Sequence, residues 1–310
     1  MPAAKHLIAL DWGTTSLRAA LLDSQGRIVE QAETADGIMA VAGRDFQAVF
    51  DKVAGGWRRD HPGAVVLAAG MVGSRQGWHE VPYLSCPAGF DELGRALSWF
   101  DGVGGSIGFV PGLATEHAGG APDVMRGEEI QVFGALDALG VADGIFVLPG
   151  THSKWVRVED RRIRDFHSYM TGEVYAVLKQ HSILSRSMLE GDPLPWEQSR
   201  AAFAAGCAAA AQGAVLHNLF SVRSRGLLGG LTNELAPDYL SGVLIGEEIR
   251  EALALLGDGV ASRIHLVCKP ALLQRYQEAL AVFGLEGLAC PEQASYLGML
   301  AIARHLGLLA

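Results

Sequence analysis

The chain has 310 residues, of which 49% are hydrophobic and 19% charged, and its formal net charge is −9. This composition excludes a disordered chain, and the negative charge argues against nucleic-acid binding, which usually needs clustered basic residues. No apolar stretch reaches the ~20 residues of a membrane span, and the four cysteines lack the spacing of a zinc site. With no signal segment before the first predicted strand, we expect a cytoplasmic protein without membrane contact.

The first half of the chain alternates between strand-like and helix-like patterns. The predicted strands cover residues 6–10, 16–22, 28–35, 64–69 and 106–110. The predicted helices cover residues 45–59, 91–99 and 127–139. Glycine, aspartate and serine mark the turns between them.

The second half begins near Gly144 and follows the same plan with longer helices. A strand is predicted at 263–267, and helices at 173–189, 199–223, 239–256, 271–283 and 293–306. The length favours two domains, for which the sequence predicts limits of 1–137 and 138–310. The last helix is a candidate for packing back onto the first domain. Alternating strands and helices predict an α/β fold.

An imperfect repeat relates the two halves, which indicates a duplicated fold. The sequence LIALDWGTTSLR at residues 7–18 returns as GIFVLPGTHSKW at residues 144–155. A constant offset of 137 residues pairs Gly13 with Gly150, Thr14 with Thr151 and Ser16 with Ser153. In each copy an apolar strand leads into a tip of glycine and hydroxyl residues, and a second strand follows.

Such tips present backbone N–H groups and hydroxyls, which are the donors that phosphate oxygens need. Two tips are therefore candidates for gripping a nucleotide polyphosphate. The candidate phosphate-binding residues are Gly13, Thr14, Thr15, Ser16, Gly150, Thr151, His152, Ser153 and Lys154. Ordinary hydroxyl-rich turn chemistry is the alternative explanation. The glycine turn containing Gly229 and Gly230 is a weaker candidate for nucleotide contact, because loops of this kind are common.

Three carboxylates are candidates for the chemistry. Asp11 ends the first strand, and Mg²⁺ held through water would relieve its repulsion of a phosphate; capping of its own turn is the alternative. Glu128 or Asp123 could accept the proton of an attacking hydroxyl. The alternative for these two is an acidic helix start, because acidic residues favour the first turn.

Substrate-binding candidates come from two segments. The glycine-rich stretch GMVGSRQGW at residues 70–78 follows a strand end, where α/β proteins place ligand loops. It contains Arg75, suited to a substrate carboxylate, together with Gln76 and Trp78. Arg126, in the charged stretch before the second tip, is a further candidate. An ordinary polar loop is the alternative for residues 70–78.

Taken together, these segments resemble one family, that of 2-dehydro-3-deoxygalactonokinase, within the sugar kinase, actin and heat-shock ATPase superfamily. The resemblance covers almost the whole chain and rests on the motifs at 11–18, 70–78, 123–129, 148–155 and 239–246. It implies two ribonuclease H-like domains with the active site in a cleft between them. The first would bind mainly substrate and carry the first phosphate motif, and the second would bind mainly ATP.

The resemblance also implies a reaction, the ATP-dependent phosphorylation of the 6-hydroxyl of 2-dehydro-3-deoxy-D-galactonate in galactonate catabolism. Asp11 matches the magnesium-associated aspartate of the first motif. Glu128 falls where related sugar kinases have a base, with glutamate replacing aspartate, and Glu129 is an alternative. Kinases for other sugars or sugar acids share this pattern. An actin-like nucleotide switch ranks last, because the chain has no obvious spare domain. The oligomeric state stays open, with a homodimer among the states allowed.

Overall fold

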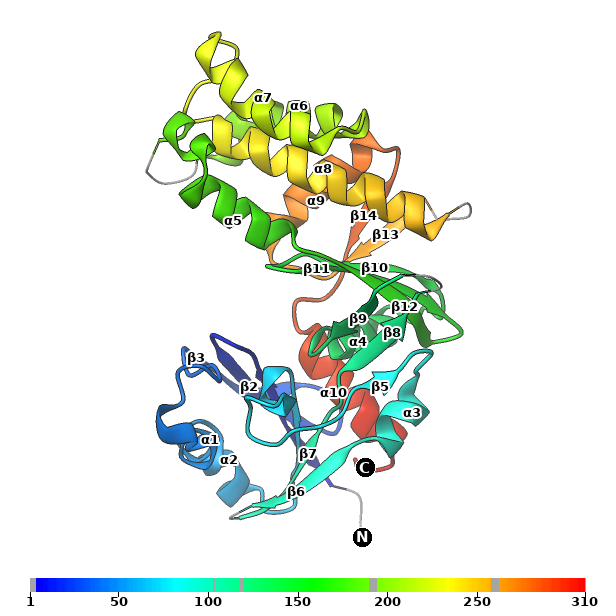
Figure 1. The fold of residues 1–310 in the computed structure, drawn as a ribbon. Coiled ribbons are helices and arrows are strands. Elements are labelled where there is room, and N and C mark those ends of the chain that lie inside the picture. Colours follow the sequence, from blue (N-terminus) through cyan, green and yellow to red (C-terminus); the bar gives the residue numbers. More distant parts are fainter. Residues whose placement is uncertain (1–3, 103, 118–119, 190–193, 258–261, 310) are drawn as a thin grey trace. The chain divides into compact units, whose positions relative to one another are not determined.

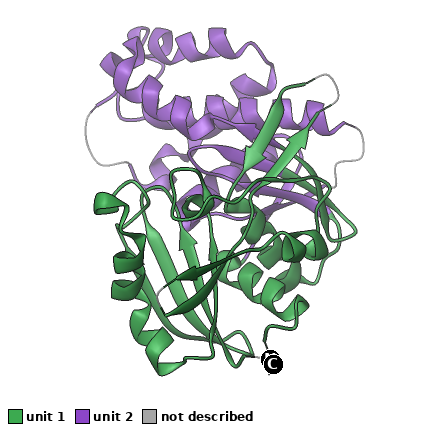
Figure 2. Ribbon diagram, turned by 60° about the horizontal axis from the view of Figure 1, so that its bottom comes forward, with its two compact units in different colours: residues 1–143, 156–166, 291–310 green, residues 144–155, 167–290 purple. Residues whose placement is uncertain are grey.

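The computed structural model describes residues 4–102, 104–117, 120–189, 194–257 and 262–309. The chain divides into two compact units, coloured separately in Figure 2. Unit 1 comprises residues 1–143, 156–166 and 291–310, and unit 2 comprises residues 144–155 and 167–290. Among the described residues, no helix has the length and apolar character needed to cross a membrane.

Unit 1 is built on a six-stranded sheet with the order β3-β2-β1-β4-β7-β6. Its strands are β1 (His6–Trp12), β2 (Leu17–Asp23), β3 (Ile28–Thr34), β4 (Val65–Ala69), β6 (Ser98–Gly102) and β7 (Gly105–Phe109). β1 runs antiparallel to β2 and parallel to β4. A smaller sheet has the order β5-β8-β9, with strands β5 (Leu84–Ser85), β8 (Leu113–Glu116) and β9 (Pro122–Met125).

Helices pack on both faces of the larger sheet. α1 (Phe46–Val53) and α2 (Gly55–Asp60) lie on one face, and α10 (Ala294–His305) lies on the other. Unit 1 also contains α3 (Phe90–Arg95) and α4 (Glu128–Leu139), which contact α10, and the short 3-10 turns η1 (Ala42–Arg44) and η2 (Met71–Gly73). Alternate side chains of a strand point to opposite faces. In β1, Ile8, Leu10 and Trp12 therefore share a core with α1 and α2. Asp11 lies on the opposite face, where α10 contacts β1.

Unit 2 contains β10 (Gly144–Leu148), β13 (Arg263–Leu266) and β14 (Glu286–Ala289), while β11 (Ser153–Glu159) and β12 (Arg162–Tyr169) run on into unit 1. Its helices are α5 (Thr171–His181), α6 (Trp196–Ala211), α7 (Val215–Leu227), α8 (Ala236–Leu256) and α9 (Pro270–Val282), with the 3-10 turn η3 (Ile183–Ser187) (Figure 1). The sheet order is β12-β11-β10-β13-β14.

The two sheets share one topology. The order β3-β2-β1-β4-β7 in unit 1 corresponds to the order β12-β11-β10-β13-β14 in unit 2. In both sheets the last three of these strands run parallel to one another. Unit 1 adds β6 as an antiparallel edge. The predicted α/β class with duplicated units is therefore confirmed. The assignment of substrate binding to residues 1–137 and of ATP binding to residues 138–310 stays a prediction.

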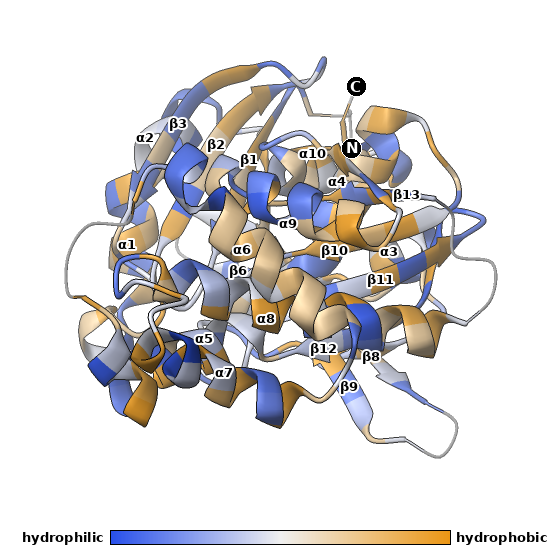
Figure 3. Cartoon of the chain, turned by 90° about the horizontal axis from the view of Figure 1, so that it is seen from above, coloured by the Kyte–Doolittle hydropathy of each residue, from blue (hydrophilic) through white to orange (hydrophobic). Residues whose placement is uncertain are grey.

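Close backbone contact joins α6 to α8. A Cβ atom at Gly206 would lie 2.2 Å from the Tyr239 carbonyl oxygen, and one at Gly242 would lie 2.0 Å from that of Phe203. Figure 3 shows α6 in the pale orange of its many alanines. Small residues let the two helices approach closely, which fixes the position of α8 in unit 2.

Several predicted helices differ in extent from the observed ones. The stretch 199–223 is two helices, because Gly213 and Ala214 adopt positive φ angles of 78° and 65° between them. The stretch 45–59 is likewise divided at Ala54. The helix predicted at 91–99 ends at Arg95, and β6 follows it. In the last case, residues 98–102 pair with the next strand, β7, in an antiparallel hairpin, which the helical periodicity does not record.

Candidate active site

The first tip joins β1 to β2 and is closed by a hydrogen bond from the Gly13 N–H to the Ser16 carbonyl, at 2.9 Å. Gly37, which follows β3, lies directly against it. A Cβ atom there would lie 2.3 Å from the Thr15 carbonyl carbon. The next N–H, of Ile38, donates to the Gly13 carbonyl at 3.0 Å. The tip is thereby fixed through its carbonyls, while the side chains of Thr14 and Thr15 are exposed.

The second tip, between β10 and β11, is held in the same way. Gly172 follows β12, and a Cβ atom there would lie 2.3 Å from the Gly150 carbonyl oxygen. The next N–H, of Glu173, donates to the Thr151 carbonyl at 3.0 Å. Thr151 and His152 stay exposed. We call Gly37 and Gly172 the clasp glycines, because each excludes any side chain where it meets its tip.

The two remaining residues of the second tip are buried. The Ser153 hydroxyl donates to Glu248 Oε1 at 2.7 Å. Lys154 Nζ donates to the Ser168 hydroxyl at 2.5 Å. Both side chains therefore lie below the tip surface, unlike Thr151. Phosphate contact by residues 150–154 stays a prediction, with Gly150, Thr151 and His152 on the exposed side of the tip.

Asp11 is mostly buried at the end of β1, with its side chain 13% exposed. Its Oδ2 atom accepts hydrogen bonds from Arg18 Nη2, across the hairpin, and from the Ser295 hydroxyl on α10, at 2.7 Å. Among the described residues, Oδ1 accepts no further hydrogen bond. No group of three or more potential metal ligands occurs there either. Asp11 is thus a lone carboxylate with one oxygen available.

The start of α4 is placed against the first tip by two glycines with positive φ. A Cβ atom at Gly127 would lie 3.2 Å from the Gly70 Cα, and one at Gly70 would lie 2.9 Å from the Trp12 carbonyl oxygen. Their φ angles are 106° and 91°, which glycine adopts without steric cost. Glu128, the first residue of α4, is partly exposed, and its Oε2 accepts the Arg126 N–H at 3.0 Å.

The neighbouring Glu129 is fully buried. Its Oε2 accepts the Gly127 N–H at 2.7 Å, and its Oε1 has no partner among the described residues. Burial, with a smaller contribution from the charge of Glu128, raises the pKa of Glu129 from an ordinary 4.5 to about 8. A buried carboxyl group of this kind is held in its neutral form near pH 7.

Arg126 is also buried and lies over the Tyr83 ring, with 4.3 Å from the guanidinium carbon to the ring centroid. Its Nη2 donates to the Val81 carbonyl at 2.7 Å. Within the described residues, its Nε and Nη1 have no partner. Asp123 lies in β9, not at a helix start, and its Oδ1 accepts the Val124 N–H at 2.7 Å.

The glycine-rich loop at 70–78 is anchored by Arg44, whose guanidinium donates to the carbonyls of Gln76 and Gly77 at 3.0 and 2.7 Å. Arg75 and Gln76 are exposed, and Arg75 forms no ion pair within the described chain. Trp78 differs from both. Its ring packs against the rings of Trp12, Phe46, Phe50, Phe100 and Phe109. Trp78 therefore belongs to the core of unit 1.

A cavity of 300 Å³ opens beside the second tip, wholly within unit 2. Its lining includes Gly150, the start of α5 at Thr171, and Tyr276 of α9. Two cations, Lys179 and Arg275, also line it. Arg275 pairs with Asp238 at 2.6 Å, whereas Lys179 has no acidic partner in the described part of the chain. No local pattern in the sequence marks this cavity, because α5, α8 and α9 contribute to it from distant positions.

Gly229 and Gly230 lie elsewhere. They follow α7, where the Gly230 N–H donates to the Arg225 carbonyl at 2.8 Å, and they line a separate cavity among α6, α7 and α8. This arrangement is a helix C-terminal turn. Neither glycine lines the cavity beside the second tip.

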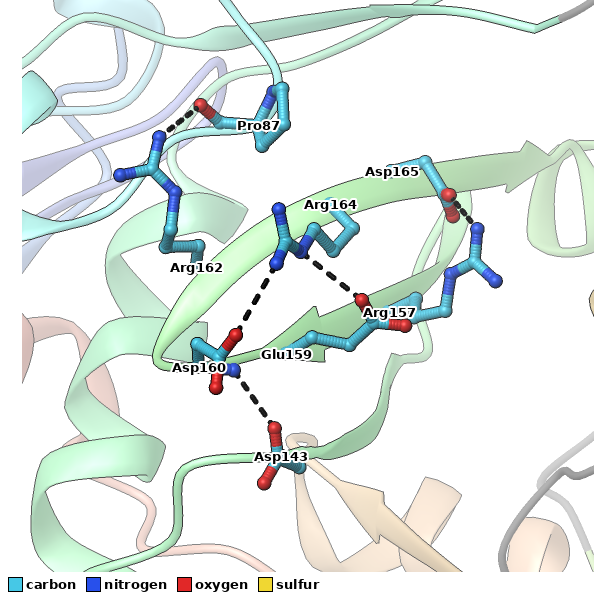
Figure 4. A network of polar contacts seen from close by, with 8 residues as sticks. All are labelled: Pro87, Asp143, Arg157, Glu159, Asp160, Arg162, Arg164 and Asp165. Carbon is cyan, nitrogen blue, oxygen red and sulfur yellow. Dashed lines mark hydrogen bonds and ion pairs between the residues drawn. The ribbon is translucent and has the colours of Figure 1, made fainter.

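A further cavity, of 590 Å³, lies in unit 1 and is lined by charged residues of the β11–β12 turn, α3 and α10. Several of its charged side chains form ion pairs with one another. Arg162 contacts Glu92 at 2.9 Å, and His305 contacts Asp91 at 2.6 Å. Figure 4 shows Arg162 bonded to the Pro87 carbonyl, beside the ion pairs of Arg164 with Glu159 and Asp160. We attribute a structural role to this network.

Comparison with known proteins decides the family. The model of the 2-keto-3-deoxy-galactonokinase family matches residues 11–302. The 2-dehydro-3-deoxygalactonokinase of Escherichia coli strain K12 is 39% identical over 282 residues, which is 90% of each chain. The chain belongs to the 2-keto-3-deoxy-galactonokinase family. It is therefore a phosphotransferase, as its sequence motifs predict.

Solved structures agree with this family. A crystal structure of a proposed 2-dehydro-3-deoxygalactonokinase from Sinorhizobium meliloti has a TM-score of 0.88 and 35% identity, covering 96% of this chain and 98% of that one. A more distant likeness shows the fold alone. The activator of 2-hydroxyisocaproyl-CoA dehydratase from Clostridium difficile, solved with bound ADPNP, has a TM-score of 0.50 and 14% identity, covering 97% of this chain and 94% of that one.

For this member of the 2-keto-3-deoxy-galactonokinase family, the buried Glu129 predicts how the free energy of unfolding depends on pH. Its pKa of about 8 in the folded state exceeds the ordinary 4.5 expected on unfolding. Between about pH 5 and pH 8, Glu129 is protonated in the folded protein and releases its proton on unfolding. The free energy of unfolding therefore falls as pH rises through this window, by roughly 1 kcal/mol per pH unit. Glu129→Gln, which does not ionise, should flatten this dependence.

The measurement is the free energy of unfolding in urea from pH 5 to pH 9. Glu197→Gln, in the first turn of α6, changes an exposed glutamate and serves as the control. Equal slopes for wild type and Glu129→Gln would show that Glu129 is ionised in the folded protein throughout this range.

Proposed function

We propose that the chain transfers the γ-phosphoryl group of ATP to the 6-hydroxyl of 2-dehydro-3-deoxy-D-galactonate, giving ADP and 2-dehydro-3-deoxy-6-phosphogalactonate. This step belongs to galactonate catabolism in the cytoplasm. Family membership supports the substrate. One structural observation carries the chemistry. Two topologically equivalent tips are each fixed by a clasp glycine while their threonine side chains stay exposed.

The tips and the cavity beside Gly150 support nucleotide binding. Exposed hydroxyls and backbone N–H groups at Thr14 and Thr151 suit phosphate oxygens. The cavity volume of 300 Å³ is within the range of small-molecule sites, and its wall combines the aromatic rings of Tyr175 and Tyr276 with Lys179. We assign the nucleoside part of ATP to this cavity and its phosphates to the tips.

Asp11 fits a magnesium ion that is held largely by phosphate and water. Mg²⁺ commonly takes only one or two protein carboxylates and keeps several waters, and Asp11 Oδ1 is the oxygen left by Arg18 and Ser295. When bound, Mg²⁺ neutralises charge on the phosphates. Arg18 and Ser295 orient the carboxylate by holding its other oxygen.

Glu128 is the proposed general base. It would accept the proton of the 6-hydroxyl while the oxygen bonds to the γ-phosphorus and the bond from that phosphorus to the β-phosphate oxygen breaks, releasing ADP. Glu128 is partly exposed at the start of α4, whereas Glu129 is fully buried and already shares the Gly127 N–H. The greater exposure of Glu128 therefore supports it over Glu129 as the base. Asp123 is part of a paired strand, and this position supports Glu128 over Asp123.

The carboxylate of the sugar acid needs a cation, and Arg75 meets this need. It is exposed on an anchored loop next to Gln76. An arginine can bind a carboxylate through two parallel hydrogen bonds. Arg126 is buried beneath the same loop, and its positive charge would also favour binding of the substrate carboxylate near Arg75. Trp78 is left out of this substrate site, because its ring is occupied by core packing.

A substrate panel tests the proposal. Coupled ADP detection should show turnover of 2-dehydro-3-deoxy-D-galactonate with ATP, and phosphate should appear on carbon 6 of the product. Neutral hexoses lack the carboxylate and should be turned over poorly. Comparable kcat/KM for a neutral hexose would contradict a site built for a sugar acid.

A second prediction concerns the base. Glu128→Gln should lower kcat by about 10²–10⁴-fold, the usual contribution of a general base, while the KM for ATP changes little. The control is Glu197→Gln, which also alters a first-turn glutamate but lies in α6 of unit 2. Wild-type kcat in the Glu128→Gln enzyme would remove Glu128 from this role.

A further inference from the structure

A second buried carboxylate, that of Glu248, lies at the centre of unit 2. Its Oε1 accepts hydrogen bonds from the Ser153 hydroxyl and from Trp155 Nε1, at 2.7 and 2.8 Å. Its Oε2 accepts from the hydroxyls of Thr171 and Tyr276, at 2.5 and 2.9 Å. Glu248 is only 2% exposed. Four donors from three other elements thus converge on one side chain of α8.

No lysine or arginine pairs with Glu248 within the described residues. Removing a carboxylate from water without a counter-ion is costly, and burial accordingly raises the pKa of Glu248, against the four hydrogen bonds that lower it. An apolar side chain would avoid this cost but would leave the four donors without an acceptor. The carboxylate is therefore best explained by what it holds in place.

Three of the four donors belong to the proposed nucleotide site. Ser153 belongs to the second tip and begins β11. Thr171 begins α5 and immediately precedes the clasp glycine, Gly172. Tyr276, with Thr171, lines the cavity beside Gly150. The position of α8 is itself fixed by its close contact with α6 at Gly206. One rigid helix therefore ties together the tip, its clasp and the cavity wall.

We propose that Glu248 is the positioning residue of the nucleotide site, which sets the second tip, the start of α5 and Tyr276 in a single arrangement before ATP binds. It acts through these residues and does not touch the nucleotide. This inference rests on the proposed function. It adds that the affinity for ATP depends on a carboxylate beneath the site, because a pre-organised site loses less free energy to ordering when ligand binds.

Glu248→Gln tests this role in the full-length enzyme. The amide nitrogen cannot accept hydrogen bonds, so two of the four donors lose their acceptor while side-chain size is kept. We expect the Kd of a magnesium–AMPPNP complex, measured by calorimetry, and the KM for ATP to rise about tenfold or more, since small displacements of positioning groups are this costly. The KM for the sugar acid should stay within about twofold of wild type.

The matched control is Glu251→Gln, an exposed glutamate on the same helix. Thr171→Val and Trp155→Phe each remove one donor and leave the carboxylate. Trp155 does not line the cavity, so its variant keeps the test valid if Glu248→Gln does not fold. Each should raise the KM for ATP by a smaller factor. Thr171→Val combined with Glu248→Gln should add less than the product of the two single effects, because both disturb one bond.

A purely structural Glu248 would lower the melting temperature and the active fraction but leave the Kd for AMPPNP and the KM for ATP of the folded enzyme unchanged. That result for all three variants would overturn the inference while leaving the proposed function intact. Failure of the wild-type enzyme to bind AMPPNP would contradict the proposed function itself, and the role of Glu248 with it.

Discussion

The close approach of a glycine backbone to a hairpin tip is the constraint on which both halves of the proposed site depend. A phosphate-binding tip must be rigid, yet its hydroxyls and N–H groups must stay open to ligand. Gly37 and Gly172 satisfy both demands by contacting the carbonyl side of each tip, where any Cβ atom would overlap the backbone at 2.3 Å. The same device at equivalent positions of two sheets with one strand order indicates that it is part of the duplicated fold.

Each unit contains a fully buried glutamate close to its part of the proposed site. Glu129 holds the Gly127 N–H at the start of α4, and Glu248 gathers the residues around the second tip. Both are buried, and burial raises the pKa of each. They differ in their partners, because Glu248 has four donors whereas one oxygen of Glu129 has none among the described residues. Glu129 is therefore suited to a neutral state and Glu248 to accepting hydrogen bonds.

The sequence predicted what local patterns encode. The repeated tip, the α/β class and most strands depend on residues close together in the chain. The clasp glycines lie outside the repeat, 24 and 22 residues after Gly13 and Gly150, so the repeat does not mark them. The direction in which a side chain points depends on partners that are distant in the sequence. Ser153 turns inward to Glu248, 95 residues away, and Trp78 is enclosed by rings from several elements. Adjacent Glu128 and Glu129 differ in burial because successive helix positions point about 100° apart.

Hydrogen–deuterium exchange of the full-length chain tests the central claim, that both tips bind the phosphates of one nucleotide. The exchange of backbone amides is compared with and without saturating AMPPNP and Mg²⁺. The account predicts slower exchange in peptides covering residues 11–16 and 149–153 together, because N–H groups of both tips would bond to phosphate oxygens. Protection of one tip alone, or of neither, in a saturated enzyme would contradict it.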